Sequence, residues 1–191
     1  ELDAMYSSRL IFTLSLISLI GIALMLDGFF ASLLSPLGIR ILLVHTIFFT
    51  CSLTVSFPMM LGLAFAIGFF WDSSHMAVTG VNDVGFGYSI VLLGLTGALM
   101  QGVCPLFKRG RWEVPVVLVG VATALLIAME WFFISFGRAK FIIPEDFWKE
   151  LWVSALLGMI VSPIFFYLIF KLSRLTGCPI LSMKDALERE V

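Results

Sequence analysis

Long apolar segments separated by short polar ones define the pattern of this chain. Because apolar residues follow one another instead of alternating with polar ones, the pattern favours helices over the strands of a membrane β-barrel. A membrane-spanning helix needs about 20 predominantly apolar residues. We therefore predict an all-α polytopic membrane protein, a compact single-domain bundle of about six transmembrane helices. The expected helices are residues 9–34, 40–56, 58–72, 85–106, 114–136 and 147–172, followed by a cytoplasmic tail, 173–191.

The second and third helices share one apolar stretch, residues 40–71, that is too long for a single crossing. As one helix it would extend about 48 Å, against roughly 30 Å of membrane hydrocarbon. Pro58 lies near its middle, where it removes a backbone donor and disfavours helix at Phe57. We therefore expect two short helices joined by a tight turn.

Composition excludes several classes of protein. Of the 191 residues, 60% are hydrophobic and 13% are charged, whereas soluble domains average about 45–50% and about 25%. This excludes a soluble enzyme, a disordered chain and a disulfide-stapled secreted module. The net charge of −1 offers no basic surface for nucleic acid. Cys51, Cys104 and Cys178 lack the spacing of a disulfide framework or metal site, so we expect free thiols.

Lysine and arginine positions predict the orientation. With six spans and a cytoplasmic N-terminus, eight of the 12 basic residues lie inside and four outside, so both termini are expected in the cytoplasm. Merging the second and third helices exchanges only Arg9 and Arg40. Charge alone therefore leaves five and six spans open, and the length of the apolar stretch together with Pro58 favours six.

Small residues recur at intervals of four in three of the expected helices. The rows are Gly94, Ala98 and Gly102; Gly120, Ala124 and Ala128; and Ser154, Gly158 and Ser162. Such rows let helix backbones approach closely in a membrane. Packing inside the bundle is the favoured interpretation, and one row could instead serve a partner helix.

Acidic residues enter the apolar segments toward the outer half, where ionisable groups are costly and need a partner or a function. They are Asp27, Asp72, Asp83 and Glu130. The favoured interpretation is a set of buried polar pairs involving Asp27, Arg40, Glu130 and Arg138. The alternative is an outward-facing polar pocket for a ligand or partner. Trp112, Trp131, Trp148 and Trp152 lie near helix ends, which is typical of interface anchors.

The sequence contains no recognisable catalytic motif. His45 and His75 lie on different elements, and no serine-hydrolase, paired-cysteine or phosphate-loop pattern occurs. Asp72 and His75 are three residues apart, but two potential ligands are weak evidence for a metal. We expect a protein that is not an enzyme and has no cofactor or metal.

Two motifs support a family resemblance. Phe65-Ala66-Ile67-Gly68-Phe69-Phe70-Trp71-Asp72 closes the third expected helix, with Asp72 as its last residue, and Gly85-Phe86-Gly87-Tyr88 opens the fourth. In the last helix, Ser162-Pro163-Ile164-Phe165-Phe166-Tyr167-Leu168 precedes two basic residues. In these motifs, in length and in its six apolar segments, the chain resembles the bacterial rod-shape-determining MreD family.

The resemblance implies a non-enzymatic, multi-pass subunit of the cell-elongation machinery in the bacterial inner membrane. Members of this family bind MreC, a single-span membrane protein, and work with MreB, RodA and its transpeptidase in peptidoglycan synthesis. The resemblance also implies a fold similar to the substrate-binding subunits of energy-coupling-factor transporters. A vitamin-type binding subunit is therefore the alternative. Its transporter-binding face would carry early alanines spaced four apart, whereas the first span here is mostly Leu, Ile and Ser.

Overall fold

The structure, a computed structural model, describes residues 2–34, 42–79, 85–103, 113–137, 141 and 143–176. Among these residues it is all-helical, which confirms the predicted fold class. The helices are α1 (Leu2–Leu34), α2 (Leu43–Ser52), α3 (Phe57–Thr79), α4 (Tyr88–Val103), α5 (Glu113–Gly137) and α6 (Phe147–Thr176). Several residues considered above lie outside the described part: Arg40, Asp83, Cys104, Trp112, Arg138, Cys178 and the side chain of His75.

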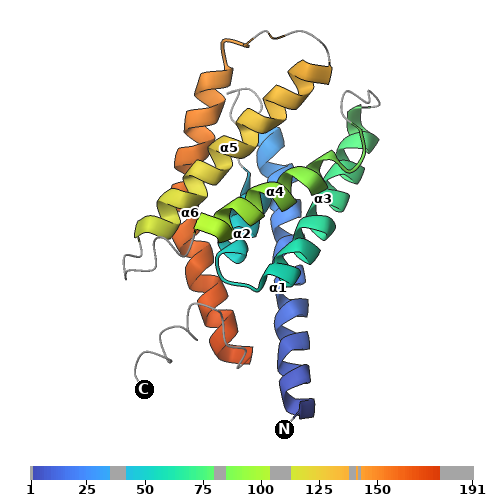
Figure 1. Ribbon diagram of the computed structural model, residues 1–191, viewed down its shortest axis with the longest axis vertical. Helices are drawn as coiled ribbons and strands as arrows, with labels where there is room; N and C mark the ends of the chain where they lie inside the picture. Colours follow the sequence, from blue (N-terminus) through green and yellow to red (C-terminus); the bar gives the residue numbers. More distant parts are fainter. Residues whose placement is uncertain are drawn as a thin grey trace.

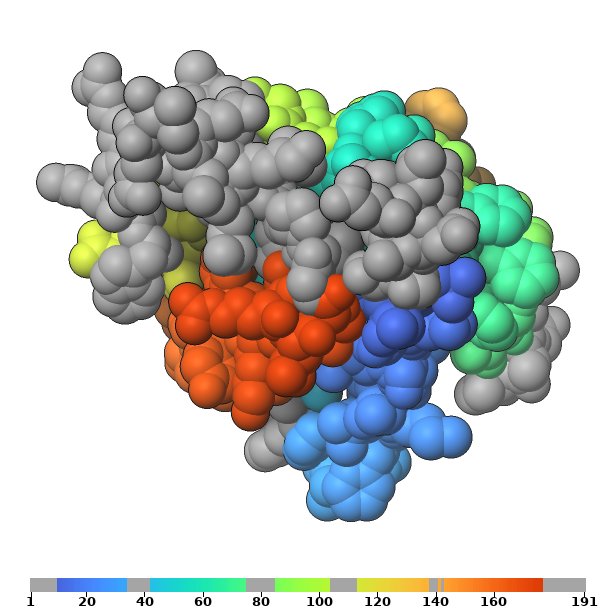
Figure 2. Space-filling model, turned by 90° about the horizontal axis from the view of Figure 1, so that it is seen from below, coloured from blue at the N-terminus to red at the C-terminus, as the bar shows by residue number. Residues whose placement is uncertain are grey.

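Successive helices run in alternating directions, so the start of α1 and the end of α6 lie at the same end of the molecule (Figure 1). Seen from that end, α1 and α6 lie side by side (Figure 2), and they contact each other. Two helix pairs, α5 with α6 and α3 with α4, make the most extensive contacts. The short α2 contacts all five other helices, so it forms the centre of the bundle.

Within the described residues, four helices are long and apolar enough to cross a membrane. The spans are Leu10–Leu33, Phe57–Ser74, Glu113–Gly137 and Phe147–Thr176. The two shorter apolar helices, α2 and α4, have 10 and 16 residues, about 15 and 24 Å at 1.5 Å per residue. These lengths and compositions indicate an integral membrane protein.

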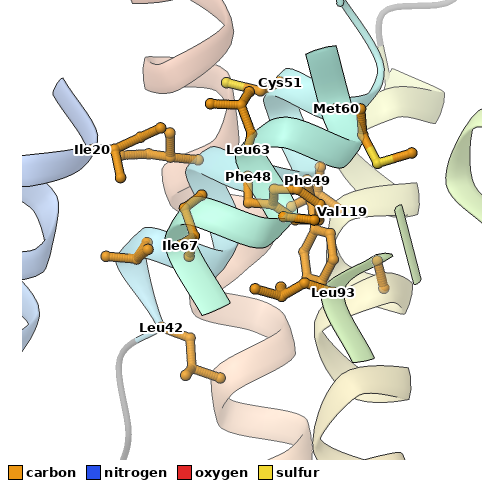
Figure 3. Packing of buried hydrophobic residues seen from close by; sticks show 14 of the residues in the cluster. Ile20, Leu42, Phe48, Phe49, Cys51, Met60, Leu63, Ile67, Leu93 and Val119 are labelled. Atoms are coloured by element: carbon orange, nitrogen blue, oxygen red, sulfur yellow. The ribbon is translucent and has the colours of Figure 1, made fainter. Parts of the chain in front are cut away.

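The core is built around α2, in which every residue from Val44 to Ser52 is buried. Phe48 and Phe49 lie at its middle, near Leu93 of α4 and Val119 of α5 (Figure 3). Because lipid is as apolar as these side chains, close packing holds such helices together better than burial alone. Cys51 is a buried free thiol, as expected from the sequence.

The break between α2 and α3 confirms two separate helices, although it comes slightly earlier than predicted. After Ser52 the chain turns, and the backbone amides of Thr54 and Val55 each donate to the carbonyl of Cys51 at 2.9 Å. Pro58 is the second residue of α3. In the first turn of a helix its missing N–H breaks no helical hydrogen bond, so proline is compatible with a helix start there.

The expectation that the third helix is short and ends at Asp72 is wrong, since α3 has 23 residues and continues to Thr79. Ser73 and Ser74, which look like helix-breaking residues, donate their hydroxyls to the carbonyls of Phe69 and Phe70 at 2.7 and 2.8 Å. Serine satisfied in this way is compatible with a helix interior. In contrast, α4 is shorter than expected, because it starts only after a turn at Gly87.

The last helix contains Pro163 and nevertheless continues to Thr176, four residues past the expected end at 172. Proline cannot donate to the carbonyl four residues before it, here that of Met159. The hydroxyl of Ser162 donates to this carbonyl at 3.1 Å. The neighbouring serine therefore replaces the missing donor inside a helix that has no water at membrane depth.

Candidate functional site

The aspartate of the first span closes the start of the central helix. Asp27 is buried, with 4% of its surface exposed. Its Oδ1 accepts a hydrogen bond from the backbone amide of Leu43 at 2.8 Å, and its Oδ2 accepts one from Val44 at 3.0 Å. The first amides of a helix have no partner within the helix, and the helix dipole favours a negative group there. Asp27 therefore links α1 to α2 through backbone contacts.

The other end of α2 is closed by Gln101 of α4, which the sequence analysis did not single out. Its Nε2 donates to the carbonyls of Ser52 and Val55 at 2.8 and 3.1 Å. Side chains from α1 and α4 thus satisfy both ends of a ten-residue helix buried in the bundle. The available signal in the sequence was an amide side chain close to the end of an apolar segment.

The two parts of the first family motif, residues 65–72 and 85–88, meet in space. Oδ2 of Asp72, in α3, accepts a hydrogen bond from the backbone amide of Gly87 at 2.8 Å. Gly87 has φ +93°, a left-handed conformation that favours glycine. The carboxylate therefore fixes the turn that leads into α4.

One helical turn before Asp72, Gly68 lets α3 and α4 approach closely. A Cβ atom at Gly68 would lie 2.6 Å from the backbone nitrogen of Ile90 and 2.7 Å from its Cα. Gly68 and Asp72 are four residues apart, so both face α4. Together they form what we call the α3–α4 junction: Gly68, Asp72, Gly87 and Ile90.

Phe65 and Gly85 differ from the other motif residues in their surroundings. Phe65 is exposed on α3 and stacks on Phe69, with ring centroids 6.2 Å apart. Phe69 in turn meets Phe86 edge to face at 5.4 Å. A Cβ atom at Gly85 would have no atom within 4 Å. These residues surround the α3–α4 junction without forming part of its backbone contact.

Small residues of α5 and α6 lie at helix contacts inside the bundle. A Cβ atom at Gly120 would overlap the side chain of Met159, and one at Gly158 would lie 3.1 Å from Oγ1 of Thr123. The remaining members of these two rows are buried or half-buried: Ala124, Ala128, Ser154 and Ser162.

The row in α4 has a different environment. Cβ atoms at Gly94 and Gly102 would have no atom within 4 Å, and Ala98 is half-buried. The glycine of α4 that lies at a close internal contact is Gly97, where a Cβ atom would lie 2.7 Å from Sδ of Met60. Among the described residues, the Gly94 row therefore does not mediate close helix packing.

A small polar cavity lies between α2, α3, α4 and α5. It is lined by Leu42, His45, Trp71, Tyr88, Ser89, Leu92, Leu93, Leu126 and Glu130. The rings of His45 and Trp71 meet edge to face, with centroids 4.6 Å apart, and the Tyr88 hydroxyl donates to the carbonyl of Met129 at 3.3 Å. Glu130, predicted to belong to a buried polar pair, thus borders this cavity.

The cavity is too small for an organic ligand. The volume open to the centre of a water molecule is about 20 Å³. By this measure a water molecule needs about 10–15 Å³, whereas pockets for drug-sized molecules span about 300–1,000 Å³ in total. The structure therefore gives this polar cavity room for water and not for a vitamin.

No group of three His, Cys, Asp or Glu residues that could hold a metal ion occurs within the part of the chain that the structure describes.

The tryptophans near the start of α6 lie at the surface. Trp148 and Trp152 are more than half exposed there, a position typical of interface anchors. Trp131 packs against Phe147, with ring centroids 5.3 Å apart.

Comparisons of the chain with models of known protein families, with characterised proteins and with solved structures found no match.

Proposed function

We propose that this protein is a non-enzymatic, MreD-like scaffold of the bacterial inner membrane that binds an MreC-like single-span protein. In this role it helps to organise peptidoglycan synthesis and rod shape together with RodA, its transpeptidase and MreB. Both termini face the cytoplasm, in agreement with the excess of basic residues on that side.

The observation that carries the proposal is the α3–α4 junction. The residues that underlie the family resemblance, Gly68, Asp72 and Gly87, are brought together by one hydrogen bond and one close backbone approach. Their roles are structural, since the carboxylate is engaged by a backbone amide and the glycine by a neighbouring helix. A motif whose residues have structural roles favours a scaffold, which presents a fixed surface, over an enzyme, which turns over a substrate.

The centre of the bundle supports the same view. Asp27 and Gln101 satisfy the two ends of α2, and α2 contacts every other helix. In a membrane, backbone groups left without partners are costly, so these contacts hold α2 in one position. A rigid interior suits a subunit whose task is to hold a partner helix.

The alternative, a vitamin-type binding subunit of a transporter, is supported by the acidic residues predicted toward the outer half and by Trp131, Trp148 and Trp152, which could stack on a ligand. One of these acids, Glu130, borders the polar cavity described above. The volume of this cavity, about 20 Å³ by the measure above, argues against that role. Calorimetry with a panel of vitamins tests the alternative directly, and we expect no binding heat.

The experiment for the scaffold role is co-purification of MreC with the tagged protein from membranes in mild detergent. Gly68→Val should abolish co-purification, because it disrupts the α3–α4 junction. Gly62→Val on the same helix is the matched control, since a Cβ atom there would have no atom within 4 Å. Reproducible failure of the unmodified protein to retain MreC would contradict the proposal.

A further inference from the structure

The polar cavity between α2, α3, α4 and α5 has a lining that suits a water molecule. Its polar side chains come from four helices, with His45 on α2, Trp71 on α3, Tyr88 and Ser89 on α4, and Glu130 on α5. His45 is 3% exposed, so one wall is deeply buried. Tyr88, Ser89 and Glu130 are half-buried and form the side nearer to the surface.

We propose that this cavity binds one ordered water molecule, which hydrogen-bonds to side chains of α4 and α5 and connects them across the cavity. The volume of about 20 Å³ exceeds the roughly 10–15 Å³ that a water molecule requires and leaves no room for an organic molecule. Buried waters occur where two to four polar groups converge. This inference stands independently of the proposed partner.

Several polar residues that line the cavity carry hydrogen-bonding groups that suit a water molecule. The Tyr88 hydroxyl uses its proton for the Met129 carbonyl at 3.3 Å, so its oxygen can still accept. The Ser89 hydroxyl can donate and accept, and the Glu130 carboxylate accepts. Water supplies two donors and two acceptors, and it therefore can serve Tyr88, Glu130 and Ser89 together.

The cavity is partly open to its surroundings. Tyr88 is the first residue of α4, one residue after the turn at Gly87 that Asp72 holds. The cavity therefore lies beside the start of α4, next to Trp71 of α3.

The direct test is a crystal structure of the full protein in detergent, at a resolution that shows ordered water. We expect one density peak within hydrogen-bonding distance of the Tyr88 oxygen and the Glu130 carboxylate. A cavity without density, while other internal waters are visible, would overturn the proposal. Anomalous density after exchange into rubidium would also overturn it, because the site would then bind a cation.

A double-mutant cycle in solution gives a second test. Adjacent residues on a helix do not face each other, so Tyr88→Phe and Ser89→Ala should couple only through a shared water. The melting temperature of the double variant should therefore fall by less than the sum of the decreases caused by the two single substitutions. Tyr167→Phe, at an exposed tyrosine of α6, is the control, and its effect should add to that of Ser89→Ala. Additivity of the Tyr88 pair would contradict the shared water.

Discussion

Oδ1 of Asp27 lies 2.8 Å from the backbone nitrogen of Leu43, so an acid in the first membrane span closes the first turn of the central helix. An ionisable group in an apolar segment suggests chemistry or ion pairing when only the sequence is considered. Here two backbone amides hold the carboxylate. The carboxyl group at this position is part of the fold.

We expect Asp27→Ala to destabilise the protein strongly, because the buried amide of Val44 and the half-buried amide of Leu43 would lose their acceptor, at up to about 1–3 kcal/mol each. Asp27→Asn keeps one carbonyl oxygen and should lose less. Thermal unfolding in detergent measures both effects. Ser32→Ala is the control on the same helix, since the Ser32 hydroxyl donates to the carbonyl of Phe29 at an exposed position. If Asp27→Ala unfolds at the temperature of the control, the account of α2 is wrong.

Gly68→Ala should destabilise the protein by about 1–3 kcal/mol, because overpacking forces backbones apart. The added methyl group would lie 2.6 Å from backbone atoms of Ile90, which cannot rotate away as a side chain could. Gly62→Ala, in open surroundings on α3, should be neutral or slightly stabilising. Equal unfolding temperatures for the two variants would show that the α3–α4 junction is not closely packed.

Ser162 and Pro163 should show energetic coupling. Ser162→Ala leaves the Met159 carbonyl without its donor, at a cost of about 1 kcal/mol. In a Pro163→Ala background, the new backbone N–H can bond this carbonyl, so the same serine substitution should cost little. Unfolding of the two single variants and the double variant measures the coupling. A serine effect of equal size in both backgrounds would contradict the compensating role of Ser162.

The start of α1 and the end of α6 lie at one end of the bundle, and the distribution of basic residues predicts that this end is cytoplasmic. We expect alkaline phosphatase fused after residue 191 to be inactive and a green fluorescent protein fused there to be bright. The same pair of fusions before residue 1 should behave identically. An active phosphatase at either end would contradict the orientation.

Apolar length and Pro58 were sufficient to predict six helices and the break between α2 and α3, because both depend on local chemistry. The end of α3 was not predictable in this way. Ser73 and Ser74 are polar, and only the helix geometry shows that they bond carbonyls of their own helix. Tertiary contacts such as that of Gln101 with Ser52 join distant segments, and no spacing in the sequence records them.

The rows of small residues also show that sequence spacing alone does not predict tertiary contacts. Periodicity of four selects Gly94 as readily as Gly120, but Gly120 packs against Met159 while Gly94 has open surroundings. The contact in α4 is made by Gly97, which belongs to no such row. Which helix face is internal depends on how the helices pack against one another, and the spacing of small residues in the sequence does not record that packing.

Native mass spectrometry of the protein released from its own membranes tests the central claim most directly. We predict a species whose mass is the sum of this chain and an MreC-like single-span protein, with no small molecule retained. The complex should disappear with Gly68→Val and persist with Gly62→Val. A protein that emerges without a protein partner but with a bound small molecule would contradict the scaffold role and favour a binding subunit.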